Sequence, residues 1–349
     1  MGMSEWRECT LGDVITLRRG HDLPERKRID GEYPVFSSSG ITGYHNEHKI
    51  PDSGVITGRY GTIGQVFFAK SAHWPLNTTL YVEDFKGNDK KYVYYFLKML
   101  DWDSFADIAS AVPGINRNHV HLARVSIPRS VAEQETIAEI LSSLDDKIGL
   151  LTRQNATLEA LAQTYFRQWF VEGVREDWKA KKLSDFFPVV TGKKDANIST
   201  EDGIYPFFTC ARDFLYTPSY SFDGSAIILA GNGDFNVKRY SGKFEAYQRT
   251  YVLIPYDKIY YNWLYLLVSM NLDDITVGHR GSVINYLTKD MITEFSFPFP
   301  PHDISKQLKS LDALFDKIDV NTKQIQTLQK LRDTLLPKLV SGEVKVKGA

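Results

Sequence analysis

The sequence contains few of the features that mark membrane, secreted or disulfide-bonded proteins. It has 2 cysteines, Cys9 and Cys210, in 349 residues, which is too few for a disulfide framework. No stretch reaches the roughly 18 consecutive apolar residues that a membrane-spanning helix needs, and the first residues do not have the charged and apolar segments of a secretory signal. We therefore expect a cytoplasmic protein that does not cross a membrane.

An excess of positive charge is also missing. Lys and Arg number 42 against 43 for Asp and Glu, so the net charge is −1. Because neutralisation of phosphates normally supplies much of the affinity for DNA, we expect any DNA binding by this chain alone to be weak and to depend on partners.

Motifs for catalysis, cofactors and metals are missing as well. No Asn-Pro-Pro-Tyr motif of the amino-methyltransferase type occurs, Ala-Gly-Asn-Gly at 230–233 lacks the further glycine of a dinucleotide loop, and Gly-Lys-Lys at 192–194 lacks the other residues of a phosphate loop. The histidine pairs at 45 and 48 and at 119 and 121 have no Cys or carboxylate set with ligand spacing. We predict a non-catalytic protein with no metal or cofactor of its own.

What the sequence does contain is an internal repeat. The length favours two domains, and the second half matches the first at an offset of about 172 residues, drifting to about 170. GEYPVF at 31–36 corresponds to GIYPFF at 203–208, VSIP at 125–128 to FSFP at 295–298, and SLDDKI at 143–148 to ALFDKI at 313–318. A duplicated unit therefore gives the order globular, helical, globular, helical.

The pattern predicts the α+β class, with two similar and mostly β domains joined by two long helices. Short runs rich in Val, Ile, Phe and Tyr are separated by Gly, Pro, Ser and Asn, and each globular part has one helical segment, at 91–100 and 260–270. The expected domains are residues 1–132 and 174–301, the expected helices are 133–173 and 302–342, and residues 343–349 form a tail.

The two long helices carry apolar residues at alternating steps of three and four, which is the heptad spacing of a coiled coil. Because the first helix leaves the first domain and delivers the chain to the second, the two can pair only in antiparallel orientation, as a pseudo-twofold pair. About 38 residues give a rod of roughly 57 Å, so we expect a spacer. The predicted seam consists of Ile137, Leu141, Leu144, Ile148, Leu151, Leu158, Tyr165 and Trp169, with Ile304, Leu308, Leu311, Phe315, Ile318, Ile325, Leu328, Leu335 and Leu339 in the second copy.

One polar residue interrupts this seam. Asn155 occupies the position at which the second copy has Ile325. A buried Asn there can fix the register of the helices at a cost in stability, and the alternative is an Asn that faces solvent at a frayed stretch.

Side chains suited to reading bases gather in corresponding loops of the two copies. Base edges in the major groove are read by Arg or Lys at guanine, by Asn or Gln at adenine and by Ser or Thr at either. Such residues in the first domain are Ser37, Ser38, Ser39, Arg59, Tyr60, Asn77, Thr78, Arg117, Asn118 and His119. Those in the second domain are Thr209, Arg212, Asn232, Asn236, Lys238, Arg239, Gln248, Arg249, His279 and Arg280. A shared framework with different loops is expected if the two domains read different half-sites. Neutral drift of solvated loops predicts the same divergence.

This arrangement resembles the DNA-specificity (S) subunits of type I restriction-modification systems over nearly the whole chain. The resemblance is carried by EQETIAEILSSLDDKIGLLTRQNATLEAL at 133–161 and ISKQLKSLDALFDKIDVNTKQIQTLQKL at 304–331, each following a Pro-ended β segment. AVPGINRNHV at 111–120 is similar to a loop of the family, and GHRGSVINYL at 278–287 departs from it by lacking the Pro.

The resemblance implies two target-recognition domains, each reading one half of an asymmetric, bipartite site in double-stranded DNA. It also implies that the helices bind two methyltransferase subunits, which hold S-adenosylmethionine and methylate adenine, and that restriction subunits can join the complex. A scaffold that reads no sequence and an enzyme with an unrecognised site are the alternative functions. DNA selection with the methyltransferase and activity assays of the chain alone discriminate among the three.

Overall fold

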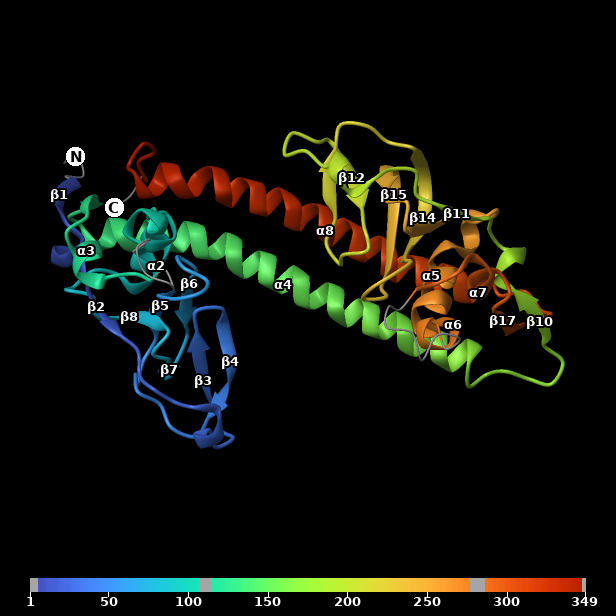
Figure 1. Ribbon diagram of the computed structural model, residues 1–349, viewed down its shortest axis with the longest axis horizontal. Helices are drawn as coiled ribbons and strands as arrows, with labels where there is room; N and C mark the ends of the chain where they lie inside the picture. Colours follow the sequence, from blue (N-terminus) through green and yellow to red (C-terminus); the bar gives the residue numbers. More distant parts are fainter. Residues whose placement is uncertain (1–5, 107–113, 277–285, 347–349) are drawn as a thin grey trace. The chain divides into compact units, whose positions relative to one another are not determined.

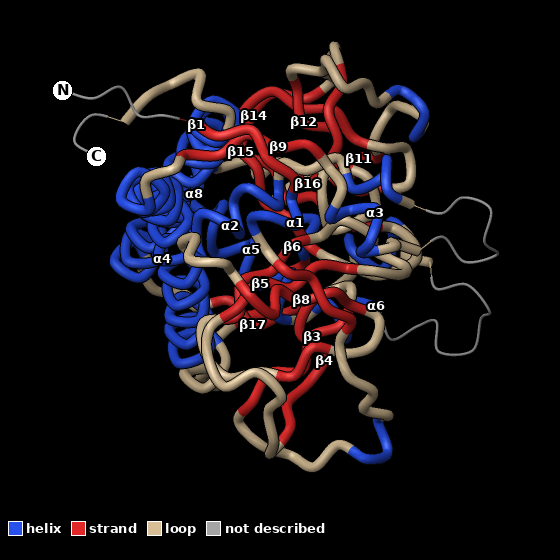
Figure 2. The backbone as a smooth tube through the Cα atoms, turned by 90° about the vertical axis from the view of Figure 1, so that its left-hand side faces the viewer, coloured by secondary structure: helices blue, strands red, loops and turns tan. Residues whose placement is uncertain are grey.

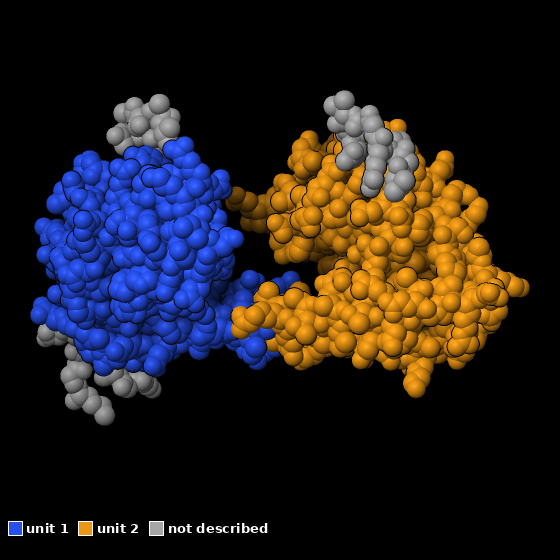
Figure 3. Space-filling view, turned by 90° about the horizontal axis from the view of Figure 1, so that it is seen from below, with its two compact units in different colours: residues 1–150, 324–349 blue, residues 151–323 orange. Residues whose placement is uncertain are grey.

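The structure is a computed structural model that describes residues 6–106, 114–276 and 286–346. The chain forms two compact units, which Figure 3 distinguishes by colour. Unit 1 consists of residues 1–150 and 324–349, and unit 2 of residues 151–323. None of the described helices combines the length and the apolar character needed to cross a membrane.

Unit 1 contains a four-stranded sheet of order β2-β8-β5-β6, a three-stranded sheet of order β4-β3-β7 and the pair β1-β9. In Figures 1 and 2 the three-stranded sheet lies at the opposite end of the unit from α2. The strands are β1 (Trp6–Thr10), β2 (Thr16–Arg19), β3 (Tyr33–Ser37), β4 (Gly40–His45), β5 (Gly54–Gly58), β6 (Val66–Ala69), β7 (Trp74–Pro75), β8 (Thr79–Asp84) and β9 (Arg124–Pro128). The short helices are α1 (Leu11–Val14), η1 (Glu25–Lys27), α2 (Lys90–Lys98), η2 (Trp102–Phe105) and α3 (Arg117–His121).

Unit 2 contains a six-stranded sheet of order β11-β16-β14-β15-β12-β13 and the pair β10-β17. Its strands are β10 (Lys179–Lys182), β11 (Val189–Thr191), β12 (Tyr205–Phe208), β13 (Leu215–Thr217), β14 (Phe222–Ala230), β15 (Val237–Ala246), β16 (Thr250–Leu253) and β17 (Ser296–Phe299). Its short helices are η3 (Leu183–Asp185), η4 (Ala196–Ile198), η5 (Lys258–Tyr260), α5 (Tyr261–Met270), α6 (Leu272–Thr276) and α7 (Lys289–Thr293). Helices α2 and α5 correspond to the two helical segments predicted within the globular parts.

The two units repeat one topology. The order β2-β8-β5-β6 in unit 1 corresponds to β11-β16-β14-β15 in unit 2, and each unit pairs its first strand with its last, β1 with β9 and β10 with β17. The main difference is the long strand β15, which also pairs with β12, whereas in unit 1 β3 pairs with the separate short strand β7. Unit 2 therefore has one large sheet where unit 1 has two smaller ones.

Matched glycines occupy a close contact in each unit. The N–H of Gly20 donates to the Thr79 carbonyl (3.0 Å), and the N–H of Gly192 donates to the Thr250 carbonyl (2.9 Å). A Cβ atom at Gly20 would lie 2.1 Å from the carbonyl oxygen of Leu76, and one at Gly192 would lie 2.1 Å from that of Tyr247. Only glycine fits such an approach, which explains why both copies of the repeat have glycine at these positions, 172 residues apart.

Two long helices supply part of the core of each unit. Helix α4 runs over Val131–Phe170 and α8 over Ser305–Val340 (Figure 1). In unit 1 the first half of α4 shares a core cluster with the last half of α8, through Ile137 and Leu141 with Leu336 and Leu339. In unit 2 the last half of α4 shares a cluster with the first half of α8, through Ala162, Phe166 and Phe170 with Leu308 and Phe315.

The predicted seam is only partly reproduced by the pattern of burial. Ile137, Leu141, Leu151, Ile304, Leu308, Leu311, Phe315 and Leu339 are buried, and Leu144, Ile148, Leu158, Ile318, Ile325, Leu328 and Leu335 are half-buried. Past Leu158 the buried stripe moves to Ala162, Phe166 and Phe170, while Tyr165 and Trp169 are half-buried. The stripe moves because this end of α4 packs on the core of unit 2, where Phe166 and Phe170 lie 6.1 and 5.7 Å from the ring of Trp263.

Asn155 does not simply face solvent. Its side-chain amide donates to Thr322 Oγ1 (3.2 Å), and its carbonyl accepts from Asn321 Nδ2 (2.8 Å). Asn321 is fully buried and also donates to Gln154 Oε1 (3.0 Å). In unit 2, α4 and α8 are therefore joined by a polar layer within an otherwise apolar seam.

Candidate nucleic-acid interface

In unit 1 the structure brings three of the predicted loops together at the ends of strands. Ser38 lies in the turn between β3 and β4, Arg59 and Tyr60 follow β5, and Thr78 precedes β8. The N–H groups of Arg59 and Tyr60 donate to the Thr78 carbonyl (2.9 and 3.3 Å). The Ser38 side chain borders the glycines on either side of Arg59 and Tyr60, because a Cβ atom at Gly58 or at Gly61 would meet it. These residues form one contiguous surface.

The side chain of Arg59 is held in a defined position. Its guanidinium lies 4.4 Å from the ring centre of Tyr60, and its Nε donates to the Ile115 carbonyl (3.4 Å). Buried Arg59 Nη1 and Thr78 Oγ1 have no hydrogen-bond partner among the described residues. Since buried polar atoms are nearly always bonded, this site is suited to a polar ligand.

The remaining predicted residues of unit 1 lie around this surface. The Ser39 N–H donates to Ser37 Oγ (3.2 Å), and Ser37 Oγ lies 3.0 Å from Ser39 Oγ within the same turn. Asn77 Nδ2 donates to Asp22 Oδ1 (2.8 Å). Arg117, Asn118 and His119 are exposed on α3, which begins two residues after Ile115.

Four predicted residues of unit 2 lie close together where the loop after β12 approaches the loop before β15. They are Thr209, Arg212, Asn236 and Lys238. Arg212 Nε donates to Asp234 Oδ2 (2.9 Å), and the Lys238 ammonium donates to the Thr209 carbonyl (3.3 Å) and to the side chain of Asn236. Asn236 is buried and donates to the Cys210 carbonyl (2.9 Å), so it supports the loops from within. Burial lowers the pKa of the Lys238 ammonium.

Three more predicted residues of unit 2 lie on the neighbouring side of the same surface. Asn232 follows β14, and Gln248 and Arg249 form the turn before β16. Gln248 Nε2 donates to Asp195 Oδ1 (2.7 Å), and the Arg249 carbonyl accepts from the Gly231 N–H (2.9 Å) and from Cys210 Sγ (3.3 Å). The Cys210 contact joins this group to the loop that carries Thr209 and Arg212.

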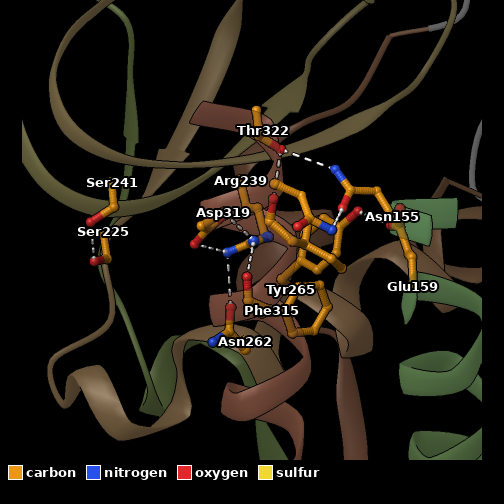
Figure 4. A network of polar contacts seen from close by, with 12 residues as sticks. Asn155, Glu159, Ser225, Arg239, Ser241, Asn262, Tyr265, Phe315, Asp319 and Thr322 are labelled. Atoms are coloured by element: carbon orange, nitrogen blue, oxygen red, sulfur yellow. Dashed lines mark hydrogen bonds and ion pairs between the residues drawn. The ribbon is translucent and has the colours of Figure 1, made fainter. Parts of the chain in front are cut away.

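Arg239 was predicted to read DNA, and the structure corrects this prediction. Its side chain is 12% exposed and forms an ion pair with Asp319 of α8, while its guanidinium lies 4.4 Å from the ring centre of Phe315 (Figure 4). It also donates to Asn262 Oδ1 (3.2 Å). Arg239 therefore fastens β15 to α8, because alternate residues of a strand point to opposite faces and Arg239 points away from the loops.

Two further predicted residues, His279 and Arg280, lie outside the described residues, as do residues 111–113 and 278–285 of the two family-like loops.

The structure also shows exposed residues that the pattern of base-reading side chains did not indicate. Arg26 and Lys27 are exposed on η1 of unit 1, where the basic run at 26–28 was a usable signal. Tyr286 is 45% exposed beside Asn232, with which it forms an isolated β-bridge. Across the described part of the chain, no three His, Cys, Asp or Glu side chains are grouped as metal ligands would be.

The described residues thus form two β-rich units of one topology that carry different polar loops. The sequence model of the type I restriction modification DNA specificity domain matches the chain twice, over residues 3–160 and 175–330. The chain belongs to this family, and the double match confirms the predicted internal repeat.

Curated relatives carry the same description. The specificity subunit of the type I restriction enzyme EcoDI from Escherichia coli is 42% identical over 173 residues, a match that covers 48% of this chain but only 39% of that protein. The MjaIX specificity subunit from Methanocaldococcus jannaschii is 28% identical over 346 residues, covering 85% of this chain and 79% of that protein. The relatives are specificity subunits, which agrees with the prediction of a non-catalytic subunit.

A solved structure shares the fold. The crystal structure of a type I restriction-modification S subunit from M. genitalium aligns with a TM-score of 0.69 at 18% identity, covering 97% of this chain and 96% of that chain.

Proposed function

We propose that this chain directs a type I restriction-modification complex to an asymmetric, bipartite DNA site, with unit 1 reading one half and unit 2 the other. The observation that carries this proposal is that one topology presents different base-reading side chains at corresponding places. Arg59, Tyr60 and Thr78 in unit 1 stand where unit 2 has Gly231, Asn232 and Arg249. Two readers with different side chains require two different half-sites.

We further propose that α4 and α8 act as an antiparallel coiled-coil spacer with pseudo-twofold symmetry. Support comes from their lengths of 40 and 36 residues, about 60 and 54 Å at the helical rise. It also comes from the shared clusters, in which the first half of each helix meets the last half of the other. Pseudo-twofold readers on one face of B-DNA need half-sites roughly one helical turn, about 10 base pairs, apart.

The proposed partners are two methyltransferase subunits bound to the helices, and restriction subunits that join them. The methyltransferase subunits would hold S-adenosylmethionine and methylate adenine. With a net charge of −1, the chain has little phosphate affinity of its own, so the partners would supply much of the non-specific binding.

Co-expression with the methyltransferase of the same system, followed by mapping of methylated adenines, tests this function. We expect one interrupted motif whose two halves differ. Methylation with no common motif would favour a scaffold that reads no sequence, and methyl transfer by the chain alone would favour an unrecognised enzyme.

The spacer is tested by inserting one heptad into both helices, near residues 150 and 323. The insertion adds about 10 Å to each helix and should widen the gap between half-sites by about three base pairs at 3.4 Å each. The control places the same seven residues in the segment 171–178, which should leave the gap unchanged. A gap that stays the same after the double insertion would exclude the spacer role.

A further inference from the structure

Unit 2 has a pocket on its predicted DNA-reading surface. The pocket has a volume of about 320 Å³, at the lower end of the range for small-ligand sites. It is lined by Thr191, Gly231, Asn232, Gln248, Arg249, Tyr251, Tyr286 and Leu287. These residues come from three chain segments that are far apart in the sequence.

Backbone hydrogen bonds fix these segments and show that unit 1 has a corresponding place. In unit 2 the Gly231 N–H donates to the Arg249 carbonyl (2.9 Å), and the Leu287 N–H donates to the Gly231 carbonyl (2.8 Å). In unit 1 the Arg59 N–H donates to the Thr78 carbonyl (2.9 Å), and the Ile115 N–H donates to the Arg59 carbonyl (3.0 Å). Arg59 therefore corresponds to Gly231.

The next residue along extends this correspondence. Tyr60 forms an isolated bridge with Gly114, and Asn232 forms one with Tyr286. Tyr60 thus corresponds to Asn232, and Gly114 corresponds to Tyr286.

The two units fill this place differently. In unit 1 the guanidinium of Arg59 stacks on the ring of Tyr60, and a Cβ atom at Gly114 would lie 2.2 Å from that ring. In unit 2 glycine replaces the arginine and asparagine replaces the tyrosine, while the large side chain, Tyr286, stands on the opposite segment. The exchange leaves a hollow where unit 1 has a packed pair of side chains.

The lining of the pocket suits a planar ligand with polar edges. Asn232 and Gln248 supply amides, Arg249 supplies a guanidinium, and Tyr286 supplies an aromatic ring. Two of the walls are held in place, because Gln248 is bonded to Asp195 (2.7 Å) and the Tyr251 hydroxyl donates to the Leu287 carbonyl (2.8 Å). Proteins that take a base out of the duplex read it by hydrogen bonds to its edge and by stacking.

We propose that this pocket binds a nucleobase rotated out of the duplex within the half-site read by unit 2. The inference rests on the proposed function. A base that stays paired presents only its edge in the groove and is met by protruding side chains. A concave site lined by amides and an aromatic ring accepts a whole base. Unit 1, which has Arg59 and Tyr60 in this place, reads its half-site without such a pocket.

The test uses the complex of the full chain with its methyltransferase subunits on the mapped site. 2-Aminopurine replaces each adenine of the unit 2 half-site in turn, and permanganate oxidation reports unstacked thymines. We expect at least one unstacked base besides the methylated adenine, seen as a several-fold rise in fluorescence or as a reactive thymine. The unit 1 half-site should show only its methylated adenine.

Two variants connect that base to the pocket. Asn232→Tyr places the unit 1 side chain in the hollow, and Gln248→Ala removes an amide from the wall. Each should abolish the extra signal and weaken binding of the site by about tenfold, the cost of one poorly read base pair. The control is Tyr256→Ala, at an exposed tyrosine that does not line the pocket and is predicted to leave the extra signal intact. Co-purification with the methyltransferase subunits confirms that each variant is folded.

The outcomes separate this inference from the function on which it rests. A defined bipartite motif with no unstacked base beyond the methylated adenines would exclude the pocket proposal alone. So would an extra unstacked base that persists in both variants. A complex that methylates no defined motif would overturn the proposed function itself.

Discussion

Arg332 on α8 and Asp145 on α4 form an ion pair in unit 1, with Nη1 and Oδ1 2.8 Å apart and side chains 22% and 27% exposed. The hydroxyl of Tyr95 donates to the other carboxylate oxygen (2.7 Å). The repeat places Phe315 and Ala162 at the corresponding positions of unit 2, where both belong to the apolar core. At this pair of equivalent positions the two helices thus form an ion pair in unit 1 and apolar core contacts in unit 2.

We expect Asp145→Ala to lower the free energy of unfolding by about 2 kcal/mol, because it leaves the charge of Arg332 half-buried without its main partner. The double variant Asp145→Phe/Arg332→Ala, which copies unit 2, should recover most of that loss. Urea denaturation measures both. Asp333→Ala removes the exposed second partner of Arg332 and should cost less than about 1 kcal/mol. Equal losses for Asp145→Ala and Asp333→Ala would contradict this interpretation.

The polar layer of Asn155 and Asn321 should behave differently from its apolar surroundings. Asn155→Ala removes one hydrogen bond of the buried Asn321 amide and should lower the free energy of unfolding by about 1 to 3 kcal/mol. Asn155→Leu combined with Asn321→Leu should be at least as stable as the natural protein, since a polar layer gives register at the expense of stability. Thermal melting compares the two. A double variant as unstable as the single one would show that the layer stabilises the helices outright.

Arg59 is predicted to read guanine in the half-site of unit 1. We expect Arg59→Ala to weaken the binding of the complex to its DNA site by about 1 to 3 kcal/mol and to relax discrimination at one base pair. Competition among duplexes with every base at each position of the site measures this. Arg26→Ala, on exposed η1, should instead weaken all sequences alike and reduce the salt dependence. Discrimination that is unchanged in Arg59→Ala would remove this residue from the readout.

Unit 1 should lose stability in mild acid. Burial lowers the pKa of His73, which is 1% exposed, and also lowers those of His21 and His121. These groups are neutral in the folded protein but take up a proton in the unfolded chain below about pH 6.5. Stability is therefore complete above that pH and falls as the pH drops toward the lowered values.

The melting temperature at about pH 5.5 should accordingly be lower than at about pH 7.5, and His73→Gln should reduce the difference. Three carboxyl groups with lowered pKa values do not contribute to this difference between about pH 5.5 and about pH 7.5. Their pKa values lie below the ordinary value of about 3.8, so they stay ionised across this range; they are Asp13, Asp52 and Asp303. A difference that is the same in the variant would show that His73 does not contribute.

The internal repeat and the two long helices could be predicted from the sequence. Glycines at tight contacts and apolar residues at heptad spacing both leave a pattern that is visible in the sequence itself. It could not show that the last turns of α4 bury Phe166 and Phe170 rather than Tyr165 and Trp169, since that depends on the core of unit 2. The same limit applies to Arg239, whose partner Asp319 is distant in sequence. The pocket was missed because Tyr286 reaches it from a separate segment.

The core of unit 1 has a consequence for the order in which the protein is completed during synthesis. Leu336, Leu339 and Val340 pack with Leu11, Tyr92 and Ile137, whereas unit 2 is one continuous segment. A nascent chain can therefore finish unit 2 while unit 1, translated earlier, still exposes the surface that the end of α8 will cover. Contacts so far apart along the chain form slowly, so unit 1 becomes native after unit 2 although most of unit 1 is translated earlier.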